Sequence, residues 1–397
     1  MTAPRLDSAP RLDIDAILDD PHTRIVVCCG SGGVGKTTTA AALGLRAAER
    51  GRRTVVLTID PARRLAQSMG LTELDNTPRR VPGVEGPDRG ELHAMMLDMK
   101  RTFDDVVLAH TDAERAEEIF ANPFYQAMSS TFAGTQEYMA MEKLGQLRAG
   151  DEWDLIIVDT PPSRSALDFL DAPQRLARFL DGRMIRLLMA PAKAGGRGML
   201  KMVTASLTFF SRIITKVLGS ELLTDVSTFV TAMDSMFGGF RERADATYRL
   251  LKTPGTAFLV VAAPEPDAVR EASYFAERLT AEDMPLAGLV LNRTHVTAAP
   301  DLTAERALAG AQALDDSGDS PLTAEALRVH ATLMQQMTRE RRYAERFTTA
   351  HPNVPVAEVP AQAEDVHDLD GLRRIGAALA TTQPAEDGAG ASVAAAP

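Results

Sequence analysis

The 397-residue sequence predicts an α/β fold: a mostly parallel, doubly wound sheet with an inserted helical subdomain. Apolar runs of strand length alternate with helical segments, which is typical of parallel strands joined by crossover helices. Two helical stretches, at about 101–147 and 173–251, are longer than such a sheet needs and predict the insertion. A composition of 45% hydrophobic and 24% charged residues is typical of a soluble globular protein.

The first strand is predicted at residues 25–29 and leads into a glycine-rich loop. The loop motif consists of Gly30, Ser31, Gly32, Gly33, Val34, Gly35, Lys36 and Thr37. In this G-x-x-x-x-G-K-[ST] pattern, backbone N–H groups hold phosphate oxygens, the lysine reaches the β- and γ-phosphates and the hydroxyl ligates Mg²⁺. The Ala- and Leu-rich helix predicted at 37–50 places its N-terminus at the same phosphates, with Thr38 expected at the α-phosphate. The sequence therefore predicts a P-loop NTPase fold and a nucleotide site.

Two further strands, at 54–59 and 152–159, each deliver an acidic residue at their carboxyl ends. Ligands of doubly wound sheets bind at that edge. We expect Asp159 to support Mg²⁺, directly or through water, together with Thr37. Asp60 then remains to polarise the attacking water, with Lys36 as the second catalytic group. Either aspartate could instead cap a helix or a turn.

The remaining core strands are predicted at 257–262, 286–291 and 354–359. Within the second helical stretch, two apolar stripes recur at three- and four-residue steps. They either pack against each other as core or form an adaptable groove for an apolar partner. Their members are Met199, Met202, Val203, Phe209, Phe210, Ile213, Ile214 and Val217 in one stripe, and Leu222, Val226, Phe229, Met233, Met236 and Phe237 in the other.

The predicted organisation is a flexible segment at 1–21, with a short helix at 14–18, an ATPase domain at 22–376 and a disordered tail at 377–397. A net charge of −11 and a pI near 5.2 argue against nucleic-acid binding. No signal peptide or membrane span is recognisable, which predicts a cytoplasmic protein. The two cysteines, Cys28 and Cys29, are adjacent in a strand and are interpreted as small core residues.

From about residue 22 to 376 the chain resembles the arsenical-pump and tail-anchored-protein-targeting ATPases. The shared motifs are Gly30–Thr38, Asp60-Pro61-Ala62, Asp159-Thr160-x-Pro162 running into Leu167-x-Phe169-Leu170, Ala263-Pro264-Glu265 and Leu291-Asn292-Arg293. The resemblance implies ATP/ADP and Mg²⁺ as cofactors. It also implies that Asn292 reads adenine and that the turn of Val359 and Pro360 packs against the base. A simple turn role for Asn292 stays open. The family works as an ATP-driven dimer whose helical subdomains open and close, and it implies a hydrophobic or membrane-protein client.

The chain departs from that family pattern at three places. The second loop position, Ser31, is a lysine in the family that reaches the partner subunit's nucleotide. Residues 159–165 lack the family's histidine, and Cys28 and Cys29 cannot form its arsenite or CxxC zinc sites. The sequence thus resembles an actinobacterial-type paralogue that hydrolyses ATP weakly alone and pairs with a paralogous subunit that retains the lysine, or with itself. Arg63, Arg64 or Arg164 could replace the missing cation, and a regulatory subunit with little catalysis is the alternative.

Overall fold

The computed structural model describes residues 9–380 except 61–63, 85–89, 124, 127–128, 130–134, 162–241 and 244. In this part of the chain eight strands form one sheet in the order β3-β4-β2-β5-β1-β6-β7-β8. All neighbouring strands are parallel except β3 and β4, which confirms the predicted fold class. The strands are β1 (Ile25–Cys29), β2 (Arg53–Thr58), β3 (Arg79–Arg80), β4 (Glu91–Met96), β5 (Leu155–Asp159), β6 (Thr256–Ala262), β7 (Leu286–Thr294) and β8 (Val356–Pro360).

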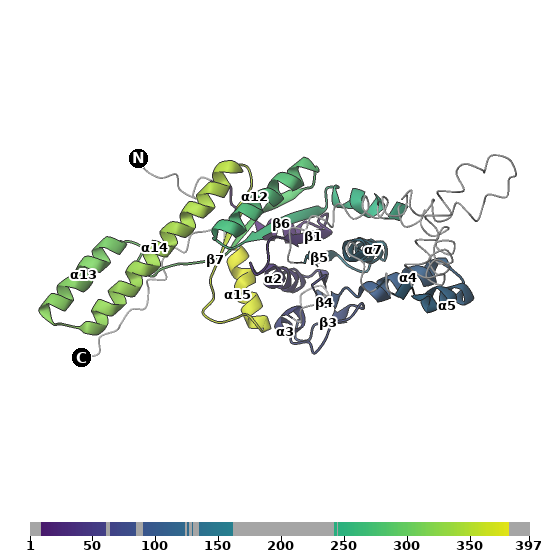
Figure 1. Cartoon of the computed structure of the whole chain (residues 1–397), viewed down its shortest axis with the longest axis horizontal. Helices are drawn as coiled ribbons and strands as arrows, with labels where there is room; N and C mark the ends of the chain where they lie inside the picture. Colours follow the sequence, from purple (N-terminus) through teal and green to yellow (C-terminus); the bar gives the residue numbers. More distant parts are fainter. Residues whose placement is uncertain are drawn as a thin grey trace, which may run out of the picture.

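Helices cover both faces of the sheet, with α2 and α15 on one face and α12 and part of α14 on the other (Figure 1). This two-sided cover explains why β1, β5 and β6 are buried along their whole length and appear in the sequence as continuous apolar runs. The helices are α1 (Ile14–Asp19), α2 (Lys36–Glu49), α3 (Arg64–Ser68), α4 (Met99–His110), α5 (Ala113–Ala121), α7 (Thr135–Ala149), α12 (Pro266–Ala281), α13 (Ala304–Ser317), α14 (Pro321–Ala350) and α15 (Leu369–Ala380).

Strands β3 and β4 had no counterpart in the sequence prediction. In β4 the half-buried residues Glu91 and His93 interrupt the apolar run, so its pattern is weaker than that of the central strands. β4 is nevertheless a full parallel neighbour of β2, and β3 adds a two-residue antiparallel edge. Tertiary pairing, rather than a strong local pattern, makes this segment a strand.

The first predicted helical stretch is divided into α4, α5 and α7. Asp112 breaks it, because its carboxylate accepts a hydrogen bond from the backbone N–H of Arg115 and so starts α5. Just before the stretch, Asp98 starts α4 in the same way by accepting from the N–H of Arg101. Most of the second stretch lies outside the described residues. So do both Met- and Phe-rich stripes, residues 162–170, Arg63 and Arg164, and the tail from residue 381.

The described part of the N-terminal segment is packed against the domain. The expected short helix is present as α1, which buries Ile14 and Leu18. The backbone N–H of Leu12 donates to the Val356 carbonyl at 3.1 Å, so residues 11 and 12 run beside β8. The proposed division into segments stays a prediction.

Helices α13 and α14 form an antiparallel hairpin that projects from the sheet, on the opposite side of the molecule from α4 and α5 (Figure 1). No separate element was predicted from the sequence in this region. Among the described helices, none combines the length and the apolar character needed to cross a bilayer.

Candidate nucleotide site

The glycine-rich loop joins β1 directly to α2, as the motif predicted. Gly30 has φ 149°, and a side-chain carbon there would lie 2.1 Å from the Val261 carbonyl oxygen of β6. Gly35 has φ 95° and caps the start of α2, and a side-chain carbon there would lie 2.2 Å from Nδ2 of Asn292. Only glycine fits both conformations and both close approaches. These two contacts fix the loop against β6 and β7, with the N-terminus of α2 beneath it.

Lys36 is the first residue of α2 and is 6% exposed. Its Nζ donates to the backbone carbonyl of Ser31 at 2.8 Å, so the side chain folds back over the loop. Burial lowers the pKa of Lys36, while the nearby carboxylates of Asp159 and Asp60 act in the opposite direction. The ammonium group is thus held inside the loop, where the anionic oxygens of a bound phosphate would be its natural partners.

Asp159, the last residue of β5, is fully buried at the centre of the site. Its Oδ2 accepts hydrogen bonds from the hydroxyls of Thr37 at 2.8 Å and Thr58 at 2.9 Å. Its Oδ1 is buried and has no hydrogen-bond partner among the described residues. Burial raises the pKa of Asp159 to about 6, although both hydroxyls and Lys36 oppose that change.

This oxygen cluster fits a hard divalent cation. Mg²⁺ prefers carboxylate and hydroxyl oxygens and keeps several waters beside bound phosphates. In this chain the unpartnered carboxylate oxygen of Asp159 lies next to the hydroxyl of Thr37. Burial disfavours the ionised form of that carboxylate, and a bound cation would compensate its charge. The two residues predicted to hold the metal therefore lie together.

Asp60 lies two residues beyond the end of β2 and is half-buried. Its backbone N–H donates to the Thr58 hydroxyl at 3.2 Å, and its negative charge contributes to the raised pKa of Asp159. The structure thus brings Asp60 to the same edge as Lys36 and Asp159. Its role toward water stays a prediction, and residues 61–63 of that switch lie outside the described part.

Asn292 lies within β7 and is buried against the phosphate loop. Its side-chain amide donates to the Val34 carbonyl at 2.8 Å, so this side chain holds the loop from the side of β7. Pro360 ends the neighbouring strand β8, and the N–H of Ala361 donates to the Thr294 carbonyl at 2.8 Å. Both residues predicted for the base lie on adjacent strands, and their contacts with adenine stay predictions.

Ser31 presents two features that the sequence did not reveal. Its carbonyl is the acceptor for Lys36, and its hydroxyl is buried without a partner among the described residues. Thr38 lies half-buried in the first turn of α2. Gly32 and Gly33 are exposed at the mouth of the loop and Val34 is buried beneath it.

Two threonines of the site were missed by sequence reasoning. Thr58 shares Asp159 with Thr37, and Thr160 donates from its hydroxyl to the Cys28 carbonyl at 2.8 Å, which ties the end of β5 to β1. Thr58 could have been recognised from the sequence, because it ends a predicted strand two residues before Asp60. Cys28 and Cys29 are both buried with free thiols, as their position in β1 predicted.

A glycine loop between a buried strand and a helix, a buried loop lysine and a threonine–aspartate pair define the class of P-loop nucleotide-binding proteins. Residues 23–309 match the family model described as anion-transporting ATPase. Because that match covers well over half of the chain, the protein belongs to the anion-transporting ATPase family.

Relatives in this family include proteins of plants, fungi and bacteria. The chain is 26% identical to ATPase GET3B of Arabidopsis thaliana over 306 residues, which cover 71% of this chain and 66% of the relative. It is 28% identical to ATPase GET3 of Podospora anserina over 44% of this chain and 50% of the relative. It is also 30% identical to an uncharacterized Streptomyces coelicolor protein over 44% and 42% of the respective chains. The matched region thus spans less than two thirds of the length of each of these relatives.

Proposed function

We propose that this chain is a cytoplasmic, Mg²⁺-dependent ATPase that converts ATP and water to ADP and phosphate. The observation that carries the proposal is the arrangement around Asp159: a buried carboxylate with one orphaned oxygen, bonded to the loop hydroxyl of Thr37 and close to Lys36. Burying these charges costs free energy in the empty protein, and a phosphate-bound cation would compensate them.

Each group has a distinct role in this proposal. Lys36 leaves the Ser31 carbonyl to bind phosphate oxygens, while the N–H groups of the loop and of α2 complete the phosphate site. Thr37 and Asp159 hold Mg²⁺, which neutralises charge on the phosphates when bound. Asp60 accepts a hydrogen bond from the attacking water and orients it.

The proposal is tested by separating nucleotide binding from hydrolysis. Lys36→Ala is expected to abolish tight ATP binding, whereas Asp60→Asn is expected to retain binding and lose turnover. Fluorescent-nucleotide titration and phosphate release measure the two quantities, and Arg270→Ala, which changes an arginine of α12 whose side chain is 77% exposed, is the matched control. Unchanged nucleotide affinity in the Lys36 variant would contradict the assignment.

We further propose that the site is completed by a neighbouring subunit. The second loop position is Ser31, and serine cannot supply the cation that the family's lysine carries to the partner's nucleotide. A cation supplied in trans is worth about 10³ to 10⁵ in rate, or roughly 4 to 7 kcal/mol, in phosphoryl transfer. A homodimer would thus hydrolyse ATP slowly, and a paralogue with the lysine would accelerate the site built on Lys36.

Mixing experiments distinguish this arrangement from a self-sufficient enzyme. ATPase activity is measured for the chain alone, with a lysine-bearing paralogue, and with that paralogue carrying alanine at its signature position. The expected result is strong activity only in the second mixture. Strong turnover by the chain alone, unchanged by any paralogue, would overturn the proposal.

We propose that ATP hydrolysis changes the conformation of the helical insertion, and that the insertion handles a hydrophobic or membrane-protein client. The similarity to ATPases named GET3 supports this assignment at the level of the family. The absence of lysine from position 31 favours one alternative function, a nucleotide-binding regulatory subunit. Normal ATP affinity without turnover in every mixture would favour that alternative.

A further inference from the structure

The carboxyl end of β7 is irregular directly beside the phosphate loop. Asn292 pairs with Val359 of β8 in the regular parallel register. Pairing resumes at Thr294 with Pro360, so Arg293 is an extra residue on the β7 side. Arg293 has φ 62°, in the left-handed region, which an arginine adopts only at a cost in free energy. A strained β-bulge thus follows the residue that contacts the loop.

Asn292 lies against the phosphate loop with little room to move. Its amide donates to the Val34 carbonyl at 2.8 Å, and a side-chain carbon at Gly35 would lie 2.2 Å from its Nδ2. Bulges beside functional sites re-aim side chains, and strained backbone persists only where the surrounding contacts hold it. The contacts that hold the chain after Arg293 therefore decide where the Asn292 amide lies.

Two sets of hydrogen bonds hold the chain directly after the bulge. On the β8 side, the backbone N–H of Ala361 donates to the Thr294 carbonyl at 2.8 Å. From α14, Oε2 of Glu340 accepts a hydrogen bond from the backbone N–H of His295 at 3.0 Å. Oε1 of the same carboxylate lies 2.6 Å from Nδ1 of the His295 ring. One carboxylate therefore holds both the backbone and the side chain of the residue two positions after Arg293.

Glu340 is itself fixed in place. Its side chain is only 11% exposed. The amide of Gln336, one turn earlier on α14, donates to Oε1 of Glu340 at 3.0 Å and lies 3.2 Å from Nδ1 of His295. In the next two turns, Ala344 and Phe347 belong to the buried core and anchor the helix at this level. Separating α14 from the end of β7 would leave a largely buried carboxylate without its donors, which is unfavourable.

We propose that Glu340 is a positioning residue of the nucleotide site. By holding His295 it maintains the bulge at Arg293, and the bulge keeps the Asn292 amide on the phosphate loop. Helix α14 of the projecting hairpin thereby contributes to nucleotide affinity. This inference rests on the proposed nucleotide binding and goes beyond it, since Glu340 lies outside every sequence motif of the site.

Nucleotide titration of folded variants tests this role. Glu340→Ala is expected to weaken ATP binding about 5-fold, the scale of one hydrogen bond at the loop. Glu340→Gln should lose less, because its amide oxygen can still accept from the backbone N–H of His295. The matched control is Glu325→Ala, which removes a carboxylate of the same helix that is 68% exposed and should leave the affinity unchanged. Circular dichroism checks that each variant is folded. Unchanged ATP affinity in folded Glu340→Ala would overturn the proposal.

A double-mutant cycle separates positioning from a general loss of stability. If Glu340 acts through Asn292, Glu340→Ala should have no further effect on ATP affinity in the Asn292→Ala background. A purely structural role would instead lower the urea midpoint and leave the ATP affinity of the folded protein unchanged. Losses that multiply in the double variant would show that Glu340 acts by another route and would contradict the proposal.

Substitution of Arg293 tests the bulge as the link. Asparagine adopts the left-handed conformation more readily than arginine, whereas a β-branched residue there is strongly disfavoured. Arg293→Asn is therefore expected to restore part of the affinity lost in Glu340→Ala, and Arg293→Val alone should weaken ATP binding. Arg293→Asn alone should bind ATP at least as tightly as the natural chain. Equal losses in the two Arg293 variants would mean that the arginine side chain matters and not the backbone conformation, which would contradict the proposed link.

The same titrations distinguish failure of this inference from failure of the proposed function. No ATP binding by the natural chain would overturn the proposed function. ATP binding that is lost in Lys36→Ala but unchanged in Glu340→Ala would overturn the positioning role alone.

Discussion

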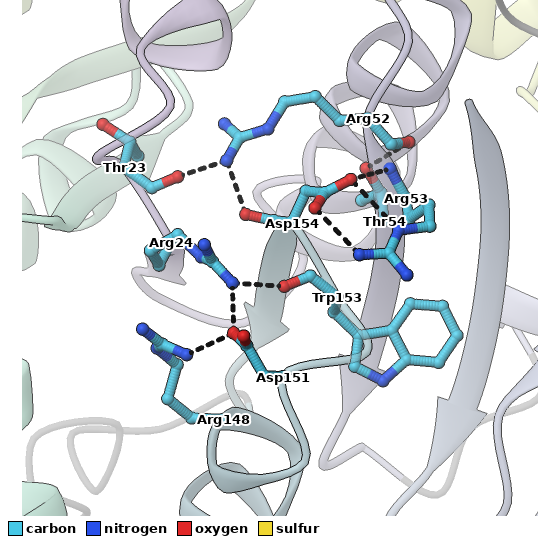
Figure 2. A network of polar contacts seen from close by, with 9 residues as sticks. All are labelled: Thr23, Arg24, Arg52, Arg53, Thr54, Arg148, Asp151, Trp153 and Asp154. Carbon is cyan, nitrogen blue, oxygen red and sulfur yellow. Dashed lines mark hydrogen bonds and ion pairs between the residues drawn. The ribbon is translucent and has the colours of Figure 1, made fainter. Parts of the chain in front are cut away.

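The two edges of the sheet differ in how far their buried polar groups are paired, although Arg24 Nε at the amino edge is also buried without a hydrogen-bond partner among the described residues. At the carboxyl edge, Asp159 and Ser31 each keep a buried oxygen without a partner among the described residues. At the amino edge, arginines and aspartates around β1, β2 and β5 are joined by a dense set of hydrogen bonds (Figure 2). Under the proposed function, the first edge holds a ligand at the expense of stability, whereas the hydrogen bonds of the second stabilise the fold. This difference separates binding residues from structural ones although both edges are polar.

Arg52 is the centre of the amino edge and gives the largest expected effect. Its guanidinium donates to the carbonyls of Thr23 at 2.6 Å and Asp154 at 2.5 Å, and also to those of Leu18 and Asp20. It thereby fastens the N-terminal segment to β5. Arg52→Met should lower the free energy of unfolding by about 3 to 5 kcal/mol, because several carbonyls lose a charged donor.

Urea unfolding followed by circular dichroism measures this loss. Arg52→Lys is the control, since it keeps the charge but cannot reach all four carbonyls, and it should give an intermediate loss. A change below about 1 kcal/mol in the methionine variant, the scale of one ordinary hydrogen bond, would show that the network is dispensable.

Asp159→Asn should have the opposite sign and stabilise the protein without ligands. The pKa of Asp159 is about 6 in the folded protein and 3.8 as the reference. Folding therefore favours the protonated form, and the ionised carboxylate costs stability. The cost is absent below pH 4, grows between pH 4 and 6 and is complete above pH 6. At pH 7.5 the variant should be about 2 to 3 kcal/mol more stable.

The pH dependence distinguishes this effect from better packing. The difference between Asp159→Asn and the natural chain should shrink toward zero as the pH falls from 7.5 to 4. The variant should also lose the dependence of ATP binding on Mg²⁺. A destabilised variant at pH 7.5 would mean that Asp159 is a structural group like those at the amino edge.

The carboxyl edge could be predicted from the sequence far better than the amino edge. The loop motif and the acids at strand ends are local patterns, so Lys36, Thr37 and Asp159 could be assigned to one site from their spacing and their strand-end positions. Arg52 and Asp154 are about a hundred residues apart, and nothing local indicates that they meet. The hairpin was missed for a related reason: its first half is apolar on two sides, and only the fold shows which side is covered. Strand β4 was missed because its pairing with β2 is tertiary.

Substitution of Asn292 tests whether this residue only supports the phosphate loop or also recognises adenine. Its amide holds the Val34 carbonyl at 2.8 Å. If it acts only through the loop, Asn292→Ala should weaken ATP and GTP binding by the same factor, about 5- to 10-fold for one hydrogen bond of roughly 1 kcal/mol or slightly more. If it also reads adenine, the loss should be larger for ATP.

Competition titrations with both nucleotides measure this ratio. Thr256→Val is the matched control, since it removes another buried hydrogen bond, to the Leu250 carbonyl, at the opposite end of the sheet at the start of β6. A loss confined to ATP would make Asn292 a specificity residue, and unchanged affinities for both nucleotides would remove it from the site.

Arg148 is at the rim of the amino edge and gives the smallest expected effect. It pairs with Asp151 at 3.1 Å, but the Asp151 side chain is 72% exposed and also pairs with Arg24 at 2.8 Å (Figure 2). Exposed ion pairs contribute between about 0 and 1 kcal/mol because water and salt screen them and ordering long side chains costs entropy. Arg148→Ala should therefore change stability by less than about 0.5 kcal/mol, and the change should vanish at 1 M salt, where charges are screened within about 3 Å. A loss approaching that of the Arg52 variant would show that the network acts as one cooperative unit, so that the amino edge depends on its outermost pair as much as on its centre.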